Sequence, residues 1–562
     1  MSPVRRRGGG VRPFVVAGAT LLVAALVLAP LAFLVDGAAD GGVAGVWNTL
    51  ATREVRGALW HTVTLALVVT ALALAGGTAL ALAFDRCLVR RSMSWRCAVG
   101  LPLLVPQFSL ALSWTQAYGP SGFTDHLIGM SLPGLYGPTG IALLLAVDSV
   151  PLVWLIVTAG LAVRREPDLV RAARASGAGP WQTFASVDLP LLRRPLLAAG
   201  AVVLVGVVNS FAVPQVLGSA EGYQTLATLA YQELSLSAAP EAFTRLCVVA
   251  LVMVLLVLLC VGGADRGLER INTGLTRTGG AGTPFSHRAG PGTCLVSVSL
   301  MAYLGLTVLL PFAALAATSL TRAPGLPPVP TNWDAAAYTS ALTGPAFVPL
   351  ARTLALAGLA ALLATVLAAL LVGLGGNARR RLGTTLTLGY AVPGTALAVG
   401  VLVGYGRWLG GSAAIILVAY LGKCAALAYR AVASGADRIP PELGQAARAS
   451  GASPVTVIRT VTAPVVSSGL AAAAALVMLF ATHEVTMSSI LYGPGTETFA
   501  VVVLNQQQLG DVGGSAALAV LLTLVPLVPL GAAFAARAAS ELGRAHLVAG
   551  MSVGVRPARR AP

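Results

Sequence analysis

The chain has 562 residues, of which 56% are hydrophobic and only 10% are charged, and it carries a formal net charge of +16. This composition excludes an ordinary soluble globular protein, in which about 25% of residues are charged. A net positive charge is also typical of nucleic-acid-binding proteins. The distribution of the arginines along the chain argues against that class.

Apolar runs of about 20 residues recur along the whole chain, and this is the length that a helix needs to cross a bilayer. They predict an all-α integral membrane protein with twelve spanning helices, six in each half. In the first half the predicted spans are Pro13–Val35, Trp60–Phe84, Cys97–Tyr118, Thr139–Ala162, Leu196–Leu217 and Phe243–Ala264. In the second half they are Cys294–Leu320, Pro349–Gly375, Leu386–Trp408, Ser412–Val432, Leu470–Leu491 and Ala516–Ala539.

The arginines divide unevenly between the predicted loops. If the N-terminus is cytoplasmic, all but six of them lie on the cytoplasmic side, and the exceptions are Arg53, Arg56, Arg245, Arg322, Arg352 and Arg407. This positive-inside pattern predicts that both termini are cytoplasmic. The basic charge therefore reflects membrane topology, and we expect no nucleic-acid partner.

The second half of the chain repeats the first at a constant offset of 274 residues. PDLVRAARASGAGPWQTFASVDLP (167–190) aligns without a gap with PELGQAARASGASPVTVIRTVTAP (441–464), and AARASG is identical in both. The sequence therefore indicates an internal duplication, with repeats over 1–264 and 294–562 and a Gly-, Thr- and Arg-rich cytoplasmic linker over 265–293. Because each repeat has an even number of helices, the repeats are parallel and a pathway is expected between them.

Each copy of the loop predicts two short cytoplasmic helices joined at a glycine. Pro167 can open a helix because its missing N–H has no intrahelical partner at that position. Small alanines follow, and they allow the backbone of another protein to come close. Gly177 and Gly451 end the first helix because glycine tolerates the left-handed conformation, and Pro190 and Pro464 end the loop before the next span.

The repeated loop resembles the EAA signature of permeases in ATP-binding-cassette (ABC) importers, whose pattern is E-A-A, three residues and then G. The chain departs from this pattern at the acidic position, where Arg171 and Gln445 stand. The resemblance implies that each loop is a coupling helix that docks on a separate ATPase subunit. The coupling residues that it implies are Ala172, Ala173, Gly177, Pro190, Gln445, Ala446, Ala447, Gly451 and Pro464.

A fused pair of halves of this length is similar to the branch of that family that handles ferric iron, thiamine or 2-aminoethylphosphonate. VNSFAVPQVLG (208–218) resembles a family segment that usually reads D-F-G-x-P, and HEVTMSSILYGPGTETFAVVVLNQQQLGD (483–511) resembles the iron-type permeases. The resemblance implies a lipid-embedded subunit of the bacterial cytoplasmic membrane, with an ATPase dimer and an extracytoplasmic solute-binding protein as partners. Ferric iron is the first expectation for the cargo.

The chain itself lacks a G-x-x-x-x-G-K-[ST] phosphate-binding loop. We therefore expect it to be no enzyme and to bind no cofactor, with ATP held by the partner subunit.

Polar residues within the predicted spans are candidates for the pathway, because a charged side chain at the bilayer centre costs about 2.5–3.5 kcal/mol on insertion scales and usually faces a cavity or a partner. The candidates are Asn209, Ser210, His483, Glu484, Asp148 and Lys423. A purely structural role remains open for each. Asp148 and Lys423 could pair with each other or reach separate polar partners. Pro106 and Pro393 occupy matching places and predict kinks.

Two other classes of protein fit the sequence less well. Asp85-Arg86 with Arg90-Arg91 partly matches the D-R-x-G-R-R loop of the major facilitator family, so a secondary active transporter is the alternative. That class gives no account of the two AARASG loops. A membrane-embedded enzyme is the third class, and the five scattered histidines offer no metal-ligand cluster for it.

Overall fold

The computed structural model describes residues 11–531, apart from 87–92, 165–166, 236–240, 273–290, 324–325, 328, 375, 440, 458, 461–462 and 529–530. Within these residues the chain is helical, and its only β-pairing is an isolated bridge between Thr321 and Trp333. In the described part, 9 helices are long and apolar enough to cross a membrane, and two bent helix pairs raise that number to 11. One shorter apolar helix, α27 (Val512–Leu524), follows them.

The elements follow the predicted spans in order. The first half contains α1 (Val11–Val23) continued by the π-helix η1 (Ala24–Leu28) and α2 (Ala29–Ala39), then α4 (Arg53–Arg86), α5 (Met93–Gly100) with α6 (Gln107–Tyr118), α8 (Pro138–Arg164), α11 (Leu189–Val208) and α14 (Ala242–Asn272). The second half contains α15 (Pro291–Leu304) continued by the π-helix η6 (Gly305–Leu309) and α16 (Leu310–Leu320), then α18 (Phe347–Leu374), α19 (Gly376–Ala391) with α20 (Gly394–Leu409), α21 (Ala413–Ala436), α24 (Ala463–His483) and α27.

The third span of each half is broken into two helical segments. The segments bend by 93° before α6 and by 106° before α20. The bends fall at Pro106 and Pro393, the two positions where kinks were expected. Proline removes a backbone donor and pushes the preceding residue out of the helical region, and Val105 accordingly has an extended backbone (φ −85°, ψ 126°).

The predicted fifth and eleventh spans, Leu196–Leu217 and Leu470–Leu491, are also interrupted. Their main helices end at Val208 and His483 and resume as short helices, α12 (Ala212–Gly218) and α25 (Thr486–Leu491). Both interruptions fall on the polar pairs Asn209–Ser210 and His483–Glu484. The mean hydropathy over a window of about 20 residues stays high across such a break, so the break does not show in the prediction.

Two further boundaries differ from the prediction. The last span, predicted as Ala516–Ala539, is described only in its first part, which forms α27, and residues 529–530 and 532–562 lie outside the described part. α14 continues into the predicted linker as far as Asn272, and residues 273–290 of that linker lie outside the described residues.

Each half is built around three helices that pack on one another: α4, α8 and α11 in the first, and α18, α21 and α24 in the second. Glycines allow these helices to approach closely, as is common where membrane helices meet. A Cβ at Gly77 would lie 2.5 Å from Val153, and one at Gly160 would lie 2.2 Å from Pro195. A side chain at either position would force α8 away from its neighbour.

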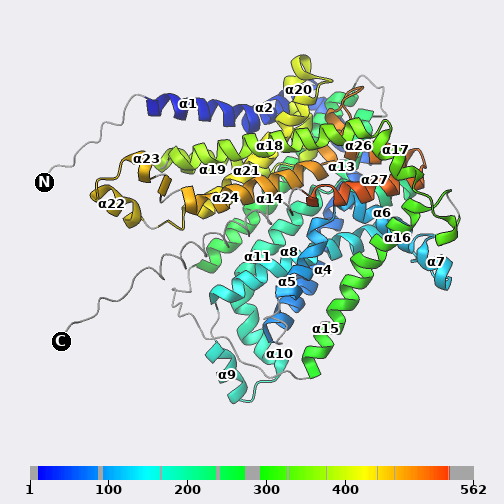
Figure 1. The fold of residues 1–562 in the computed structure, drawn as a ribbon, viewed down its shortest axis with the longest axis horizontal. Helices are drawn as coiled ribbons and strands as arrows, with labels where there is room; N and C mark the ends of the chain where they lie inside the picture. Colours follow the sequence, from blue (N-terminus) through cyan, green and yellow to red (C-terminus); the bar gives the residue numbers. More distant parts are fainter. Residues whose placement is uncertain are drawn as a thin grey trace, which may run out of the picture.

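The first span of each half packs against the opposite half (Figure 1). α2 lies against α20, and α16 lies against α6. At Gly400 of α20 a Cβ would be 2.3 Å from the backbone oxygen of Pro30, so only glycine permits this approach. The two halves are therefore interlocked through exchanged first helices.

Hydrogen bonds to the π-helices hold these exchanged helices in place. A π-helix and a following proline disturb the regular backbone pairing and free carbonyl groups. Tyr405 of α20 donates to the carbonyl of Ala25 at 2.7 Å. In the other half, Tyr118 of α6 donates to Leu306, and Trp114 donates to Thr307 at 3.0 Å.

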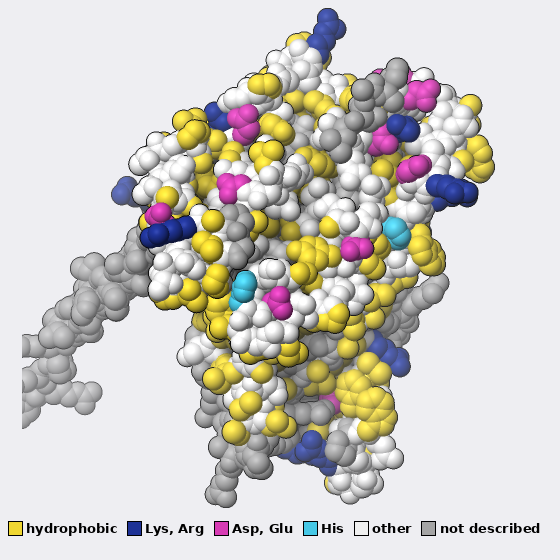
Figure 2. Space-filling view, turned by 90° about the vertical axis from the view of Figure 1, so that its right-hand side faces the viewer, with side chains coloured by type: hydrophobic (Ala, Val, Ile, Leu, Met, Phe, Trp, Pro, Cys, Tyr) yellow, Lys and Arg dark blue, Asp and Glu magenta, His cyan; other side chains and the backbone are white. Residues whose placement is uncertain are grey.

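In Figure 1 the two repeated loops lie apart, the first at the bottom and the second at the left edge, and the short helices α7 (Phe123–Ile128) and α17 (Ala336–Thr343) lie at the right-hand end. Figure 2 shows this right-hand end, where acidic and basic side chains are scattered among apolar ones. They form no patch of a single sign in that view.

We predict that Tyr405→Phe lowers the free energy of unfolding by about 1 kcal/mol, because the freed Ala25 carbonyl loses its donor in an apolar environment. Denaturant titration in mixed micelles measures this change. Tyr136→Phe is the matched control, since the Tyr136 hydroxyl makes no hydrogen bond within the described part of the chain, and we expect a change below about 0.5 kcal/mol. Equal effects of the two substitutions would contradict the assignment.

Candidate functional site

The two copies of the repeated loop fold into the same unit. Their short helices are α9 (Pro167–Ala175) and α10 (Pro180–Thr183) in the first copy, and α22 (Pro441–Ala449) and α23 (Pro454–Val457) in the second. Gly177 and Gly451 have φ angles of 85° and 83°, the left-handed conformation that ends a helix. Ala178 donates its amide to Ala173 at 3.0 Å, and Ala452 donates to Ala447 at the same distance.

Most residues of the implied coupling set are accessible. Ala172, Gly177, Gln445, Ala446 and Gly451 are exposed, and Ala173 and Ala447 are half-buried. No atom lies within 4 Å of a Cβ built on either glycine. Leu169 and Leu443, which occupy equivalent positions, are 45% and 49% exposed. Each loop therefore presents a small-residue, partly apolar surface that is left uncovered within the described chain.

The remaining loop residues are placed differently. Pro190 and Pro464 are the second residues of α11 and α24. The π-helix η4 (Phe184–Asp188) runs directly into α11, so Pro190 lies within a continuous helix and does not end the loop as predicted. Pro190 is half-buried, and the side chain of Pro464 lies outside the described residues. Arg171 and Gln445, at the acidic position of the signature, are both exposed.

In the first half, the polar candidates meet where two broken spans come together. Asp148 accepts a hydrogen bond from the Gln107 amide at 2.8 Å, and the Ser210 hydroxyl lies 3.4 Å from the Gln107 side-chain oxygen. The side-chain oxygen of Asn209 is buried without a partner. Asp148, Ser210 and Gln107 thus form one cluster contributed by the third, fourth and fifth spans.

The second half has a corresponding cluster with different chemistry. Lys423 donates to the backbone carbonyls of Tyr390, at 2.8 Å, and Val392. The Glu484 carboxylate accepts from the backbone N–H of Met487 at 2.8 Å, and it lies close enough to Lys423 for the two groups to interact electrostatically. Asp148 and Lys423 therefore reach separate polar partners, the second of the two alternatives considered above.

His483 lies beside Glu484 at the end of α24. Its ring lies near the backbone of Leu522 in α27, and its Nε2 atom is buried without a hydrogen-bond partner. The ring therefore lies between the break in the eleventh span and the last helix.

Sequence reasoning missed a pair of outer clamps that hold the loops after α12 and α25. In the first half, His61 of α4 pairs through Nδ1 with the carbonyl of Gln224 at 2.9 Å, and Thr62 accepts from the N–H of Leu226 at 3.0 Å. Leu226 is the first residue of α13 (Leu226–Ser235). The His61 ring also stacks on Tyr223, with centroids 4.2 Å apart.

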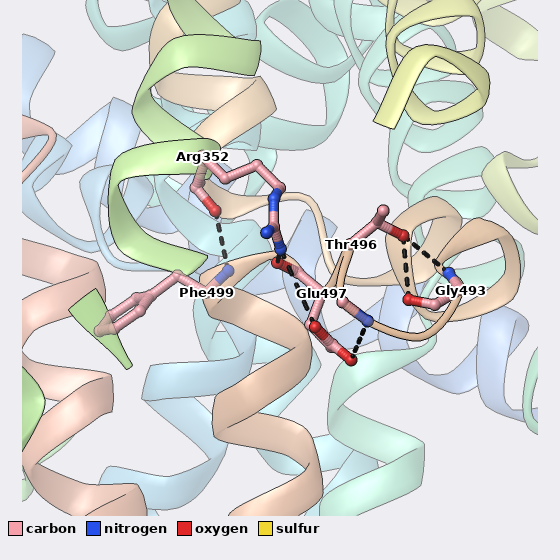
Figure 3. Close-up of polar contacts among 7 residues, drawn as sticks. Arg352, Gly493, Thr496, Glu497 and Phe499 are labelled. Atoms are coloured by element: carbon pink, nitrogen blue, oxygen red, sulfur yellow. Dashed lines mark hydrogen bonds and ion pairs between the residues drawn. The ribbon is translucent and has the colours of Figure 1, made fainter. Parts of the chain in front are cut away.

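The clamp of the second half has the same geometry (Figure 3). Arg352 of α18 donates to the carbonyl of Glu497 at 2.7 Å, and Thr353 accepts from the N–H of Phe499 at 2.8 Å. Phe499 is the first residue of α26 (Phe499–Gln508). The sequence signal was a polar residue followed by threonine near the outer end of the second span in both halves.

The arrangement defines a membrane permease: two interlocked helical halves, polar clusters at matching breaks, and two exposed loops. Residues 4–270 and 360–537 match the model of the family described as binding-protein-dependent transport system inner membrane component. The chain belongs to this family of inner-membrane permeases of ABC importers.

Three relatives are informative. The chain is 25% identical over 476 residues to "Probable ABC transporter permease protein y4fN" of Sinorhizobium fredii, covering 81% of this chain and 82% of the relative. It is 23% identical over 503 residues to "Fe(3+)-transport system permease protein FbpB 2" of Haemophilus influenzae, covering 87% and 92%. It is 28% identical over 199 residues to "Putative 2-aminoethylphosphonate transport system permease protein PhnV" of Salmonella typhimurium, covering 34% and 75%.

These findings do not favour the secondary-transporter alternative. The relatives are permease subunits and not ATPases, which fits a membrane subunit without enzymatic activity of its own.

We predict that Thr353→Val destabilises the outer end of the second half. The substitution removes the acceptor of the buried Phe499 N–H and costs about 1–2 kcal/mol in the free energy of unfolding. Amide hydrogen exchange would report the opening as faster exchange at Phe499. Thr64→Val is the control, because the half-buried Thr64 hydroxyl bonds to carbonyls of its own helix in the other half of the molecule and makes no contact with Phe499. Unchanged exchange at Phe499 in the Thr353 variant would rule out the clamp.

Proposed function

We propose that this chain forms the complete translocation pathway of an ABC importer and couples it to a separate ATPase dimer through α9 and α22. The observation that carries the proposal is the pair of exposed helix–glycine–helix loops, which have matching hydrogen bonds and the same left-handed glycine. Two equivalent surfaces suit a partner with two equivalent clefts. ATP is bound and hydrolysed by that partner.

The coupling surface consists of Ala172, Ala173 and Gly177 in the first loop and Gln445, Ala446, Ala447 and Gly451 in the second. Small side chains let the partner's backbone approach, and Leu169 and Leu443 offer apolar area for burial. Because Arg171 and Gln445 replace the usual glutamate, the contact at that position is not the one that an acidic side chain would make.

The pathway is proposed to run between the halves, past the breaks at Asn209–Ser210 and His483–Glu484. A helix break is tolerated at membrane depth only where the backbone is buried in protein or lines a cavity. The unpartnered atoms of Asn209 and His483 are available for a passing polar solute. An extracytoplasmic binding protein would deliver that solute to the outer end.

Ferric iron is the first proposal for the cargo, with 2-aminoethylphosphonate and thiamine next. The ferric transport relative is itself long enough to align with both halves, over 503 residues. The 2-aminoethylphosphonate relative aligns with 34% of this chain.

The proposal is tested by the ATPase activity of the complex in lipid nanodiscs, assembled from this chain, its neighbouring ATPase and its candidate binding proteins. We expect the binding protein loaded with ferric iron to stimulate hydrolysis. We expect Gly177→Asp with Gly451→Asp to abolish that stimulation, because a side chain at φ near +85° strains the turn and an added charge alters the docking surface.

Ser434→Asp, on the exposed cytoplasmic end of α21, places the same charge outside the loops and should leave the stimulation unchanged. Stimulation by a different loaded binding protein would reassign the cargo. Uptake driven by an ion gradient, with no associated ATPase, would refute the importer function.

A further inference from the structure

The bends in the third spans leave backbone groups without their helical hydrogen-bond partners, and side chains of the fourth spans bind at these bends. At each bend the helix ladder stops within the membrane, and the last carbonyls of α19 and the first residues of α6 lose regular partners. Unsatisfied backbone groups are costly in hydrocarbon. Side chains from a neighbouring helix therefore have to supply the missing partners.

Asp148 and Lys423 lie at similar depths in the two halves. α8 begins at Pro138 and α21 begins at Ala413, so each charged residue stands ten positions after the start of its helix. At 1.5 Å per residue this is about 15 Å, near the middle of a bilayer core about 30 Å thick. Residues at similar depth in the two halves thus carry opposite charges, although the 274-residue offset of the repeated loops pairs Asp148 with Gly422, the residue before Lys423.

The two residues hold the bend from opposite sides. Asp148 binds the side chain of Gln107, the first residue of α6, so a negative charge lies at the positive end of a helix. Lys423 donates to Tyr390 and Val392 at the end of α19, so a positive charge lies at the negative end of a helix. Its Nζ atom also lies 5.3 Å from the Tyr390 ring centroid.

The fourth spans lead directly to the repeated loops. α8 ends at Arg164 and α9 begins at Pro167, and α21 ends at Ala436 and α22 begins at Pro441. The segments that follow the bends, α6 and α20, carry the contacts between the halves, because α6 packs on α16 and α27 while α20 packs on α2 and α14. Asp148 thus joins the loop-bearing α8 to the interface helix α6, and Lys423 joins the loop-bearing α21 to the end of α19, directly before the interface helix α20.

We propose that Asp148 and Lys423 are positioning residues that transmit movement of the loop-bearing fourth helices to the bent third helices, and that they are not ligands of the cargo. This inference rests on the proposed function of the loops as the ATPase contact. A pull on α8 or α21 moves its charged residue, and the residue carries the end of α6 or α19 with it. The pathway between the halves then opens and closes as the loops move.

The test measures cargo molecules transported per ATP hydrolysed in proteoliposomes. Lys423→Gln removes the charge while keeping a polar side chain, and we expect the ratio to fall at least tenfold because hydrolysis continues without movement of the end of α19 and of the bend that leads to α20. Lys423→Arg retains the cation and should restore the ratio to within about threefold of the wild type. Arg430→Gln, on the exposed surface of the same helix, is the control and should leave the ratio unchanged.

Asp148→Asn provides a second, nearly isosteric variant in the other half, in case Lys423→Gln does not assemble. It should lower the same ratio. A normal ratio in both variants would overturn the inference, as would a higher cargo concentration for half-maximal transport with a normal ratio at saturation, since that result marks a cargo ligand. Failure of the proposed function is distinguishable, because the wild-type complex would then show no stimulated hydrolysis.

Discussion

The architecture depends on how carbonyl groups are satisfied where helices are interrupted inside a membrane. Water cannot reach such groups in hydrocarbon, so each interruption needs a side-chain donor from elsewhere in the protein. The Tyr405 hydroxyl donates a hydrogen bond to the Ala25 carbonyl. The Tyr303 hydroxyl of α15 donates to the carbonyl of Val147, which has no helical donor because Pro151 lacks an N–H. Because these donors come from distant segments, each interruption also fixes how two helices pack. The same requirement therefore shapes the exchange of first helices, the bends and the outer loops.

The duplication has preserved geometry more strictly than chemistry. Asp148 and Lys423 stand at similar depths and hold equivalent bends with opposite charges. The outer clamps use an imidazole, His61, in one half and a guanidinium, Arg352, in the other, and both reach the same type of carbonyl. A polar contact to a backbone group can be made by many side chains, whereas the position of the group is set by the fold. The two sides of the interface have thus become chemically unlike while remaining structurally equivalent.

Much of this could be predicted from the sequence. The repeat, the loop geometry and the positions of the bends follow from AARASG, from Gly177 and Gly451 and from the two matching prolines, because each acts locally. The exchange of first helices could not be predicted from the sequence. The hydropathy of Pro13–Ala39 indicates that this segment is long and apolar enough to span a membrane, but it does not indicate which half of the protein the segment packs against. The breaks at Asn209 and His483 were missed because the apolar residues on either side conceal two polar ones in a window average. These two breaks become visible only in the structure.

The exchanged helices also impose an order on synthesis. α6 is already made when α16 emerges, so that contact can form at once. α2, in contrast, must wait for α20, and 355 residues separate Ala39 from Gly394. At about 5–20 residues per second, the nascent chain holds its first helix in the membrane for roughly 20–70 s before the partner exists. During that interval the backbone oxygens of η1 lack the Tyr405 donor. Biogenesis therefore includes a half-assembled stage in which the insertion machinery, lipid or water must shelter the first helix.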